Sequence, residues 1–587
     1  MKRFWTMSAL LITGLLLSGA AGAEDLQLAT YGHPALEAIN QAYESNEITL
    51  DEAMLYRLYF VKDFDKLPTQ FQVAGEPVKS ATPILLGVYD YAEGEASSQL
   101  RQTVANYRAR PYNLPLTRET EHFIIHYTDT GGDAASEAYV NVIEAACEES
   151  YQRFFVDLTW DAPPGDGYAG GGLDMIDCYI HDCGAGILGY AEPENPVSGG
   201  PPNDQTGYFH VDNGIGSVGT RSCTTSHEFM HVTQFGYNAS FANVWYMENC
   251  AMIAEEFVYD NYNDYIGYIG SWFAQPHKSL KTFNGMYEYG GIVWPMYKWE
   301  RFDVEVIELI WEEIKWGTNI WTAFDVVLAG YGYTGIEAYM ELMRWAFYTG
   351  PRYEGTHFEE AGMWSANFYP DRTFSSYPTG EQHPSSVRKP EPYGTSILRF
   401  NPESGSSDNM LELTFNGPDC TAGVDVMVKC GDLYYEYTIE LNASGDGYIE
   451  VPNFDESCDY AFVMTSMQRE CNVAQDYYIM ADTSEGAASV PDQGPRVRVY
   501  PNYPNPFTTH TAINYALGAN SDVTVRIYDA SGRVVRDLFS GGQYAGNYEL
   551  MWNGDDDAGN KVGTGVYFAR IQTGAGEPIV RELTVVR

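Results

Sequence analysis

The sequence predicts a multidomain protein in which an α+β domain is followed by two β-sandwich domains. A chain of 587 residues has room for three or four domains. Strand-like runs alternate with amphipathic helical stretches over residues 116–385, whereas residues 392–485 and 497–587 carry mainly alternating strand-like runs. An apolar content of 44% is enough for each region to bury a core.

The first 23 residues have the pattern of a secretory signal peptide. Lys2 and Arg3 precede a short apolar run that closes on the small residues Ala-Gly-Ala. We expect cleavage before Glu24. A retained anchor is the alternative, but the run is short for one, and no other segment approaches membrane-spanning length. The sequence therefore predicts an exported protein without stable membrane insertion.

Charge and cysteine content narrow the partners and the compartment. Eighty acidic residues against 34 basic ones give a net charge of −46, which argues against nucleic acid and anionic membrane surfaces as partners. The nine cysteines fit an oxidising compartment, and the odd number leaves at least one unpaired or shared. Four of them cluster between residues 420 and 471 and are expected to form one or two disulfides.

Residues 24–115 read as helical. The run ALEAINQAYESNEITLDEAMLYRLYFV carries apolar residues three and four apart, and Thr49 is placed to cap the second helix in it. No chemistry suggests itself there, so we expect a prosegment or a supporting helical layer.

The α+β region, residues 116–385, begins with strand, helix and strand. HFIIHYT and LDMIDCYIHD predict strands, ASEAYVNVIEAACEESYQRFF between them predicts an amphipathic helix, and GYFHVD predicts a further strand. Residues 245–348 are rich in Trp, Tyr, Met and Glu at helical spacing, which predicts a mainly α second half. Proline, glycine and serine accumulate over residues 377–395 and again over 483–495, and domain boundaries are expected there.

The stretch TTSHEFMHVTQFGYN contains the pattern H-E-x-x-H at His227, Glu228 and His231. On a helix the two histidines lie one turn apart on the same face and can offer two nitrogens to one metal ion. Zinc takes this arrangement together with a third protein ligand and an open position for water, from which Glu228 could accept a proton. Ser226 or Thr225 is expected to cap the helix, and Gly236 to end it.

Glu248 is the candidate for the third ligand. It lies in WYMENCAMIAEEF, a second predicted helix, and Ala251 on that helix is small enough to let the two helices approach. HEFMH followed by WYMENCA resembles the gluzincin metallopeptidases, and the resemblance implies His227, His231 and Glu248 as Zn2+ ligands and Glu228 as the catalytic base. Because only 16 residues separate His231 from Glu248, fewer than is usual in that group, Glu255 and Glu256 stay open as alternatives.

Residues 50–300 further resemble a group of secreted bacterial metallopeptidases first noted in myxobacteria. The features that carry this are HFIIHYTDTGGDA, GYAEPE, HEFMHVTQFGY, WYMENCAMIAEE and YEYGGIVWPMY. The resemblance implies a zincin-like domain over residues 116–385.

Tyr287 is the candidate donor to the oxyanion that develops during hydrolysis. YEYGG resembles the Y-E-x-G segment of zinc aminopeptidases, which implies this role for its tyrosine, with Tyr289 as second choice and His277 or His210 as substitutes. The pattern G-x-M-E-N of aminopeptidases is not visible ahead of the His helix. An endopeptidase acting on protein or peptide substrates is therefore expected.

Two cysteines flank the candidate site. Cys223 lies four residues before His227 and Cys250 two after Glu248, so that a disulfide between them would tie the two helices together. Cys250 as a zinc thiolate is the rival interpretation.

Residues 497–587 resemble the type A C-terminal sorting domain of type IX secretion, whose pattern overlaps with the immunoglobulin-like domain of flagellar hook-capping proteins. YPNYPNPF and the strand-like runs after it carry the resemblance, which implies the secretion machinery as a partner and a secreted or cell-surface location. Asp555, Asp556 and Asp557 could suggest Ca2+, but a hairpin turn is the better interpretation.

Two classes of function follow from these observations. The leading hypothesis is a secreted zinc metallopeptidase. The alternative is a non-catalytic surface or adhesive protein that keeps a peptidase-like scaffold, and hydrolysis of a non-peptide substrate is a third option. The intact H-E-x-x-H favours the first, since a decayed site would be free to lose Glu228.

Overall fold

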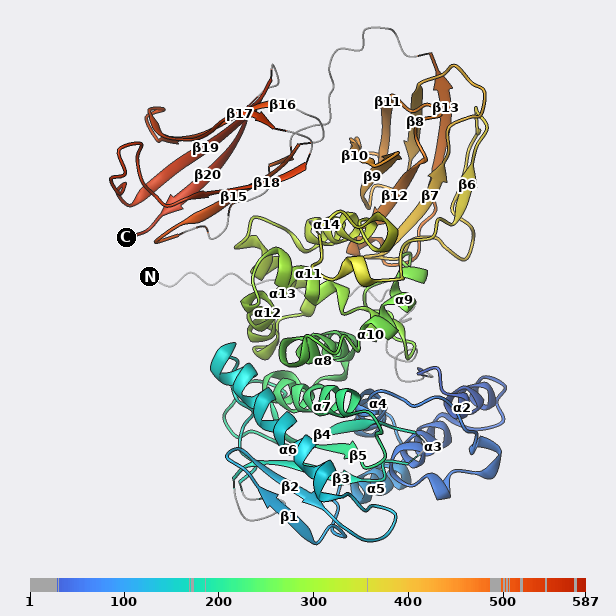
Figure 1. Ribbon diagram of the computed structural model, residues 1–587. Helices are drawn as coiled ribbons and strands as arrows, with labels where there is room; N and C mark the ends of the chain where they lie inside the picture. The colour runs from blue at the N-terminus through green and yellow to red at the C-terminus, as the bar shows by residue number, and fades with distance from the viewer. Residues whose placement is uncertain are drawn as a thin grey trace, which may run out of the picture.

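A computed structural model gives the arrangement of the chain (Figure 1). Helices precede a mixed sheet, further helices follow it, and two β-sandwich regions end the chain. The structure describes residues 29–587 except 30, 168, 170–173, 185, 356, 486–497, 500–501, 503–504, 506, 518–520, 544–545 and 575–577. The expected signal peptide, 1–23, and most of the expected boundary at 483–495 lie outside the described residues.

The N-terminal region is helical, as predicted. Its helices are α2 (Pro34–Glu44), α3 (Leu50–Lys62), α4 (Thr82–Gly94) and α5 (Ser98–Tyr107). Thr49 caps α3 in a reciprocal capping box, in which its hydroxyl accepts the N–H of Glu52 and the Glu52 carboxylate accepts the N–H of Thr49.

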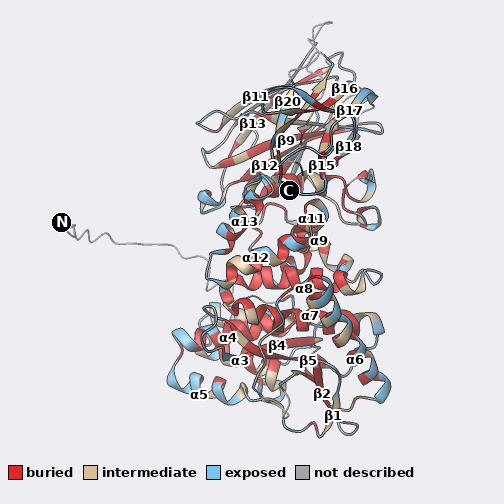
Figure 2. Ribbon diagram, turned by 90° about the vertical axis from the view of Figure 1, so that its left-hand side faces the viewer, coloured by how far each residue is buried: buried red, intermediate tan, exposed pale blue. Residues whose placement is uncertain are grey.

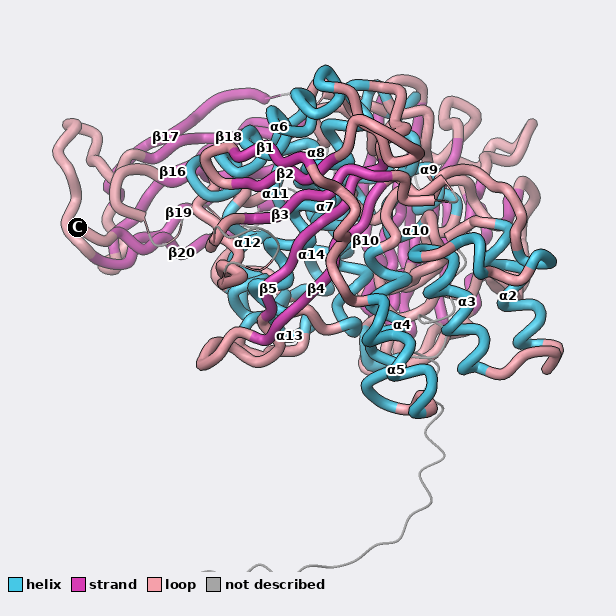
Figure 3. Tube along the Cα trace, turned by 90° about the horizontal axis from the view of Figure 1, so that it is seen from below, coloured by secondary structure: helices cyan, strands magenta, loops and turns pink. Residues whose placement is uncertain are grey.

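A mixed five-stranded sheet with the order β1-β2-β3-β5-β4 forms the base of the α+β region. Its strands are β1 (Leu116–Glu119), β2 (Phe123–Tyr127), β3 (Ile176–His181), β4 (Gly189–Pro196) and β5 (Gln205–Asp212), and α6 (Glu137–Tyr151) connects β2 to β3. β2, β3 and β5 are parallel, whereas β4 runs antiparallel to β5. Seen from below, α2 to α5 gather on one side of this sheet (Figure 3). β4 is therefore the strand whose outer edge faces the N-terminal helices.

Two buried helices lie above the sheet, α7 (Val218–Asn238) and α8 (Val244–Tyr259), joined through Phe241–Asn243 (Figure 2). The expected bounds of the first helix were wrong. It begins after Ser217, whose hydroxyl accepts the N–H of Thr220, while the hydroxyl of Ser226 donates to the carbonyl of Ala254 on α8 at 3.3 Å. It also runs through Gly236, where an added Cβ would lie 2.8 Å from Pro164 Cδ, so glycine serves close packing there.

The rest of the α+β region is helical, as expected from its aromatic periodicity. It contains α9 (Ile266–Ala274), α10 (Tyr287–Gly290), α11 (Val293–Arg301), α12 (Glu305–Lys315), α13 (Ile320–Ala329) and α14 (Gly335–Phe347). Trp294 and Trp311 are among its largest fully buried side chains. α14 packs on the next domain, where Arg344 pairs with Asp425 at 2.9 Å.

The first β-sandwich region consists of two sheets with the orders β10-β9-β12-β7-β6 and β11-β8-β13. Its strands are β6 (Arg372–Phe374), β7 (Thr395–Phe400), β8 (Met410–Asn416), β9 (Thr421–Cys430), β10 (Leu433–Ile439), β11 (Asp446–Pro452), β12 (Tyr460–Met467) and β13 (Tyr478–Ser484).

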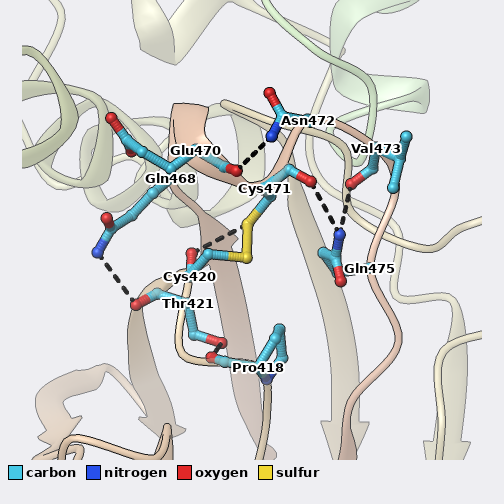
Figure 4. The surroundings of a disulfide bond; sticks show 9 residues. All are labelled: Pro418, Cys420, Thr421, Gln468, Glu470, Cys471, Asn472, Val473 and Gln475. Carbon is cyan, nitrogen blue, oxygen red and sulfur yellow. Dashed lines mark hydrogen bonds between the residues drawn. A yellow bond between two sulfur atoms is a disulfide. The ribbon is translucent and has the colours of Figure 1, made fainter. Parts of the chain in front are cut away.

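Two disulfides, Cys420–Cys471 and Cys430–Cys458, staple this region, as the cysteine cluster predicted. Figure 4 shows the first of them beside a hydrogen bond from Gln468 Nε2 to the carbonyl of Thr421. The expected bond between Cys223 and Cys250 does not form, and both residues are buried free thiols. The sulfur of Cys250 instead accepts a hydrogen bond from the Trp311 indole N–H at 3.4 Å.

The C-terminal region has sheets with the orders β14-β15-β18 and β17-β16-β19-β20. Its strands are β14 (Arg498–Val499), β15 (Thr511–Leu517), β16 (Ser521–Asp529), β17 (Val534–Gln543), β18 (Gly546–Trp552), β19 (Gly565–Thr573) and β20 (Ile579–Val585). Within the described part of the chain, we find no helix with the length and apolarity needed to cross a membrane.

Candidate metal centre

Helix α7 presents the H-E-x-x-H residues inside the molecule. His227 and His231 lie one turn apart, with ring centroids 4.9 Å from each other, and Glu228 lies between them in the chain. All three side chains belong to fully buried residues. A buried pair of histidines needs polar partners to offset the loss of water, and α8 supplies them.

Glu248 on α8 meets both histidines. Its Oε2 lies 3.2 Å from His227 Nε2, and its Oε1 lies 3.1 Å from His231 Nε2. One donor atom from each of these residues lies within 4.8 Å of the others, an arrangement of a size that a single ion can bridge. The structure thus brings together the three residues predicted as ligands.

The outer ring nitrogens are held in place as well. His227 Nδ1 lies 2.8 Å from Glu255 Oε1, and His231 Nδ1 lies 2.9 Å from Gln234 Oε1. Gln234 in turn donates from Nε2 to the carbonyl of Met247 at 3.0 Å. Because an acceptor at Nδ1 fixes a proton there, Nε2 is the nitrogen of each ring that could offer a lone pair to an ion beside Glu248.

Glu255 is therefore an outer partner of a histidine rather than the third ligand. It follows Glu248 by seven residues, two turns on, and so lies on the same face of α8. Glu256 is turned away from that face, and burial together with the nearby Glu255 and Glu360 raises its pKa to about 9. The number of residues from Glu248, seven for Glu255 and eight for Glu256, could have shown from the sequence which of the two lies on the same face of the helix.

Hydrogen bonding and charge at this cluster fit a cation. His231 Nε2 and Glu248 Oε1 are buried and complete no hydrogen bond within the described residues, despite their 3.1 Å approach. Burial lowers the pKa of His227, but Glu248 and Glu255 outweigh it and raise that pKa to about 10. Burial raises the pKa of Glu248, but His231 and His227 lower it to about 2. Two imidazoles and a carboxylate are also a donor set that zinc accepts.

Glu228 points to the start of β4 and to the N-terminal region. Its Oε2 accepts hydrogen bonds from the hydroxyls of Thr82 at 2.9 Å and Ser80 at 3.3 Å, and its Oε1 is buried without a hydrogen bond among the described atoms. A Cβ added to Gly189 would lie 2.9 Å from Glu228 Cγ, so this glycine permits the approach of β4 to α7. Burial raises the pKa of the Glu228 carboxyl.

The expected oxyanion donor, Tyr287, does not join the cluster. Its hydroxyl donates to the carbonyl of Lys278 at 3.2 Å. The second choice, Tyr289, has its ring 6.3 Å from that of His227, and its hydroxyl lies 3.3 Å from the backbone nitrogen of Ser80. The two residues are two positions apart on the short helix α10, which turns their side chains about 200° away from each other.

The two substitute histidines are placed elsewhere. His210 on β5 lies 2.8 Å from His181 through Nδ1 and 3.2 Å from Glu192 through Nε2. The carbonyl of His277 accepts the backbone N–H of Glu391, next to the first β-sandwich region.

The Asp555–Asp557 run forms a turn. The Asp556 carboxylate accepts the backbone N–H groups of Ala558 and Asn560, and Asp557 accepts the N–H of Asp537. This agrees with the hairpin interpretation of the sequence.

Ser80, Thr82, Gly189 and Gln234 are functional candidates that sequence reasoning missed. Gln234 follows His231 by three residues on one helix, a spacing that could have revealed it. Ser80 and Thr82 lie about 150 residues before Glu228 in the chain, and no local pattern links them to it.

Comparison with known proteins assigns a fold to the C-terminal region. Residues 507–577 match the family of the FlgD Ig-like domain. No curated protein matches the chain. The C-terminal region is therefore immunoglobulin-like, as its resemblance to the domain of flagellar hook-capping proteins implied.

Similarity to solved structures is limited. PorZ, an essential bacterial surface component of the type-IX secretion system of Porphyromonas gingivalis, is 25% identical over 19% of this chain and 14% of its own, with a TM-score of 0.12. Dimeric latent PorU from the same organism is 17% identical over 33% of this chain and 20% of its own, with a TM-score of 0.18. A β-1,2-glucanase from Parabacteroides distasonis is 9% identical over 36% of each chain, with a TM-score of 0.12. The chain thus spans well under half the length of each of these proteins, and the low scores define no common architecture.

Proposed function

We propose that the chain is a secreted zinc metallopeptidase, with residues 116–385 as a zincin-like catalytic domain that acts as an endopeptidase. The observation that carries the proposal is the convergence of His227 Nε2, His231 Nε2 and the Glu248 carboxylate in a buried cluster, with atoms left without hydrogen bonds. Such a donor set, with a glutamate beside the first histidine, is suited to hydrolysis.

The roles of the residues follow from their contacts. His227, His231 and Glu248 would hold zinc, which when bound supplies Lewis-acid activation of water and of a substrate carbonyl. Glu228 has one oxygen held by Thr82 and Ser80 and the other without a hydrogen bond, so it can accept a proton there and pass it to the leaving amine. In place of Tyr287, Tyr289 is the better placed donor to the developing oxyanion.

Metal analysis of the purified protein, paired with digestion of casein and a peptide library, tests this proposal. We expect about one zinc per chain. In protein whose site has been opened as described below, we expect hydrolysis that a chelator abolishes and added zinc restores. Zinc at stoichiometric level without hydrolysis, in protein whose site has been opened as described below, would support the non-catalytic alternative. Protein without zinc would overturn the metal assignment itself.

One observation favours the alternative of a non-catalytic surface or adhesive protein. The candidate ligands and Glu228 are fully buried, which leaves a substrate no direct approach in this conformation. Part of this burial comes from the N-terminal region, whose Ser80 and Thr82 contact Glu228, and the next subsection argues that this contact reflects control of access.

We further propose that residues 497–587 act as a sorting domain that delivers the protein to the secretion machinery. The match of residues 507–577 to an immunoglobulin-like family supports a separately folded module there. Deletion of residues 497–587 should leave zinc binding intact and retain the protein inside the cell, as fractionation would show. Normal export of the shortened chain would contradict this role.

A further inference from the structure

The N-terminal region closes the candidate metal centre. Residues 78–82, here called the covering segment, run from the exposed loop 72–77 into α4. Val78, Ser80 and Thr82 in this segment are buried. The segment lies directly over Glu228, since Ser80 and Thr82 contact its carboxylate.

The covering segment occupies the outer edge at the start of β4. The N–H of Val78 donates to the carbonyl of Gly186, the N–H of Leu188 donates to the carbonyl of Val78, both at 2.9 Å, and the N–H of Ala81 donates to the carbonyl of Gly189 at 3.0 Å. Val78 and Ile187 form a parallel bridge. The other edge of β4 pairs with β5, so the segment takes the one edge at which an extended peptide could add.

Side chains of the covering segment complete the closure. Thr82 Oγ1 accepts the N–H of Ala191 at 2.7 Å while its hydroxyl donates to Glu228. Lys79 Nζ pairs with Glu255 at 3.1 Å and with Asp264 at 2.5 Å, which ties the segment to the outer partner of His227. The segment thus contacts the edge of β4, the candidate base Glu228, and Glu255, which holds the ring of His227.

We infer that the covering segment holds the site latent, and that a peptide reaches the metal centre only after residues 78–82 leave the edge of β4. This inference rests on the proposed function, because a peptide substrate would need the same sheet edge and the same approach to Glu228 that the covering segment occupies. The covering segment and a substrate are therefore mutually exclusive.

The first experiment opens the segment by substitution. Val78 is 3% exposed, so Val78→Asp places a charge in the buried stretch and should drive residues 78–82 away from Glu228 and the edge of β4. Val73→Asp is the matched control, since Val73 lies five residues earlier in the exposed loop at 38% exposure, where the same charge stays in contact with solvent. A fluorescent hydroxamate, a small zinc-binding probe, reports access to the metal without requiring catalysis.

The second experiment cuts the chain. Tyr112 is 99% exposed between α5 and β1, so a recognition sequence for a specific protease can be inserted after it. Cutting there frees the N-terminal region from the rest of the chain, and mild denaturant can then release it. The same insertion after Val387, which is 77% exposed near the start of the first β-sandwich region, is the control. This arm decides the inference if Val78→Asp does not fold.

With equal zinc content in all forms, we expect the probe to bind at least about tenfold faster to Val78→Asp and to the Tyr112-cut protein than to the parent and both controls. Equal rates in parent and opened forms would overturn the inference. Faster probe binding without peptide hydrolysis would uphold the covering role and overturn the proposed peptidase. Rapid hydrolysis by the uncut parent would uphold the proposed peptidase and overturn the covering role.

Discussion

His227 Nδ1 and Glu255 Oε1 lie 2.8 Å apart, so that the carboxylate considered as a rival ligand instead contacts a candidate ligand from the outer side of its ring. Glu255 also pairs with Lys79 of the covering segment at 3.1 Å. One buried carboxylate therefore connects the orientation of a histidine on α7 with the position of the N-terminal region. A change at Glu255 should act on metal affinity rather than on the proton transfer step.

Glu255→Ala should weaken zinc binding about 10- to 100-fold, because the His227 ring loses the acceptor that fixes its tautomer and direction. Glu255→Gln, which keeps an acceptor oxygen, should lie between this variant and the parent. Competition with a chelator of known zinc affinity measures the effect. Glu256→Ala is the matched control, since Glu256 is the next residue on α8 and is turned about 100° from the helix face that carries Glu255. Equal losses at positions 255 and 256 would mean a general disturbance of α8.

Glu228→Gln should keep zinc and lose hydrolysis by about 100- to 10,000-fold, because the amide cannot accept the proton that the carboxylate takes. The comparison is made in protein opened by Val78→Asp or by the cut after Tyr112, with kcat measured on a peptide. Glu248→Ala gives the contrasting result, in which zinc itself is lost. Activity of Glu228→Gln close to that of the parent would remove Glu228 from the mechanism.

Local patterns predicted the helices and strands well, and they also predicted most of the residues that meet in the candidate metal centre. His227 and His231 are one helical turn apart, and Glu248 lies within a helical run. Information from one or two turns of chain is therefore enough to place each side chain on its helix. The alternation of the C-terminal strands was equally local. The helical spacing of seven residues from Glu248 would also have indicated that Glu255, rather than Glu256, lies on the face toward the histidines. In the same way, α10 turns Tyr289 rather than Tyr287 toward the cluster.

What could not be predicted depends on contacts between distant parts of the chain. The covering segment reaches β4 only because α4 packs beside the sheet, and no periodicity in residues 78–82 encodes that pairing. The free thiols of Cys223 and Cys250 have the same origin, since Trp311 from α12 takes up the sulfur of Cys250. The predicted disulfide between these two cysteines rested on their spacing in the sequence alone.

Gly189→Ala should impair the centre, because its new Cβ would lie 2.9 Å from Glu228 Cγ and 2.9 Å from the carbonyl of His210. Neither the backbone of His210 nor the buried side chain of Glu228 can move away without strain. We therefore expect a loss of about 1–3 kcal/mol in stability and a displaced Glu228. Thermal unfolding and kcat of the opened protein measure the two effects. Gly132→Ala is the control, as nothing lies within 4 Å of a Cβ built there. An unaffected Gly189→Ala would show that β4 and α7 are not in close contact.

The disulfide Cys420–Cys471 should stabilise the first β-sandwich region without affecting the metal centre. It closes a loop with a sequence separation of 51 residues, for which chain entropy gives about 4 kcal/mol. Replacing both cysteines with serine should lower the unfolding temperature of this region in calorimetry and leave zinc content unchanged. A simultaneous loss of zinc would indicate that this sandwich region stabilises the helices around the candidate metal centre.

Lys62 on α3 and Glu192 on β4 form a buried ion pair between the N-terminal region and the sheet. Burial raises the pKa of Glu192, but Lys62 and His210 outweigh it and hold that pKa well below its ordinary value. Since the folded pKa is the lower one, the charged carboxylate stabilises the fold above the unfolded pKa of about 4.3, and this stability is lost as the pH falls below it.

Lys62→Met leaves Glu192 charged and short of a partner at pH 7, which should cost about 3–5 kcal/mol. The difference from the parent should shrink at pH 3.5, because without Lys62 the pKa of Glu192 is no longer held down. Glu192 then takes up a proton in the variant and loses its unpaired buried charge. Unfolding in urea at pH 7.5 and at pH 3.5 measures both values. Lys66→Met is the control, since Lys66 pairs with Asp63 at the surface and its loss should change little at either pH. A difference between Lys62→Met and the parent that stays constant with pH would mean that the packing of the lysine stem, rather than the charge on Glu192, holds the N-terminal region to β4.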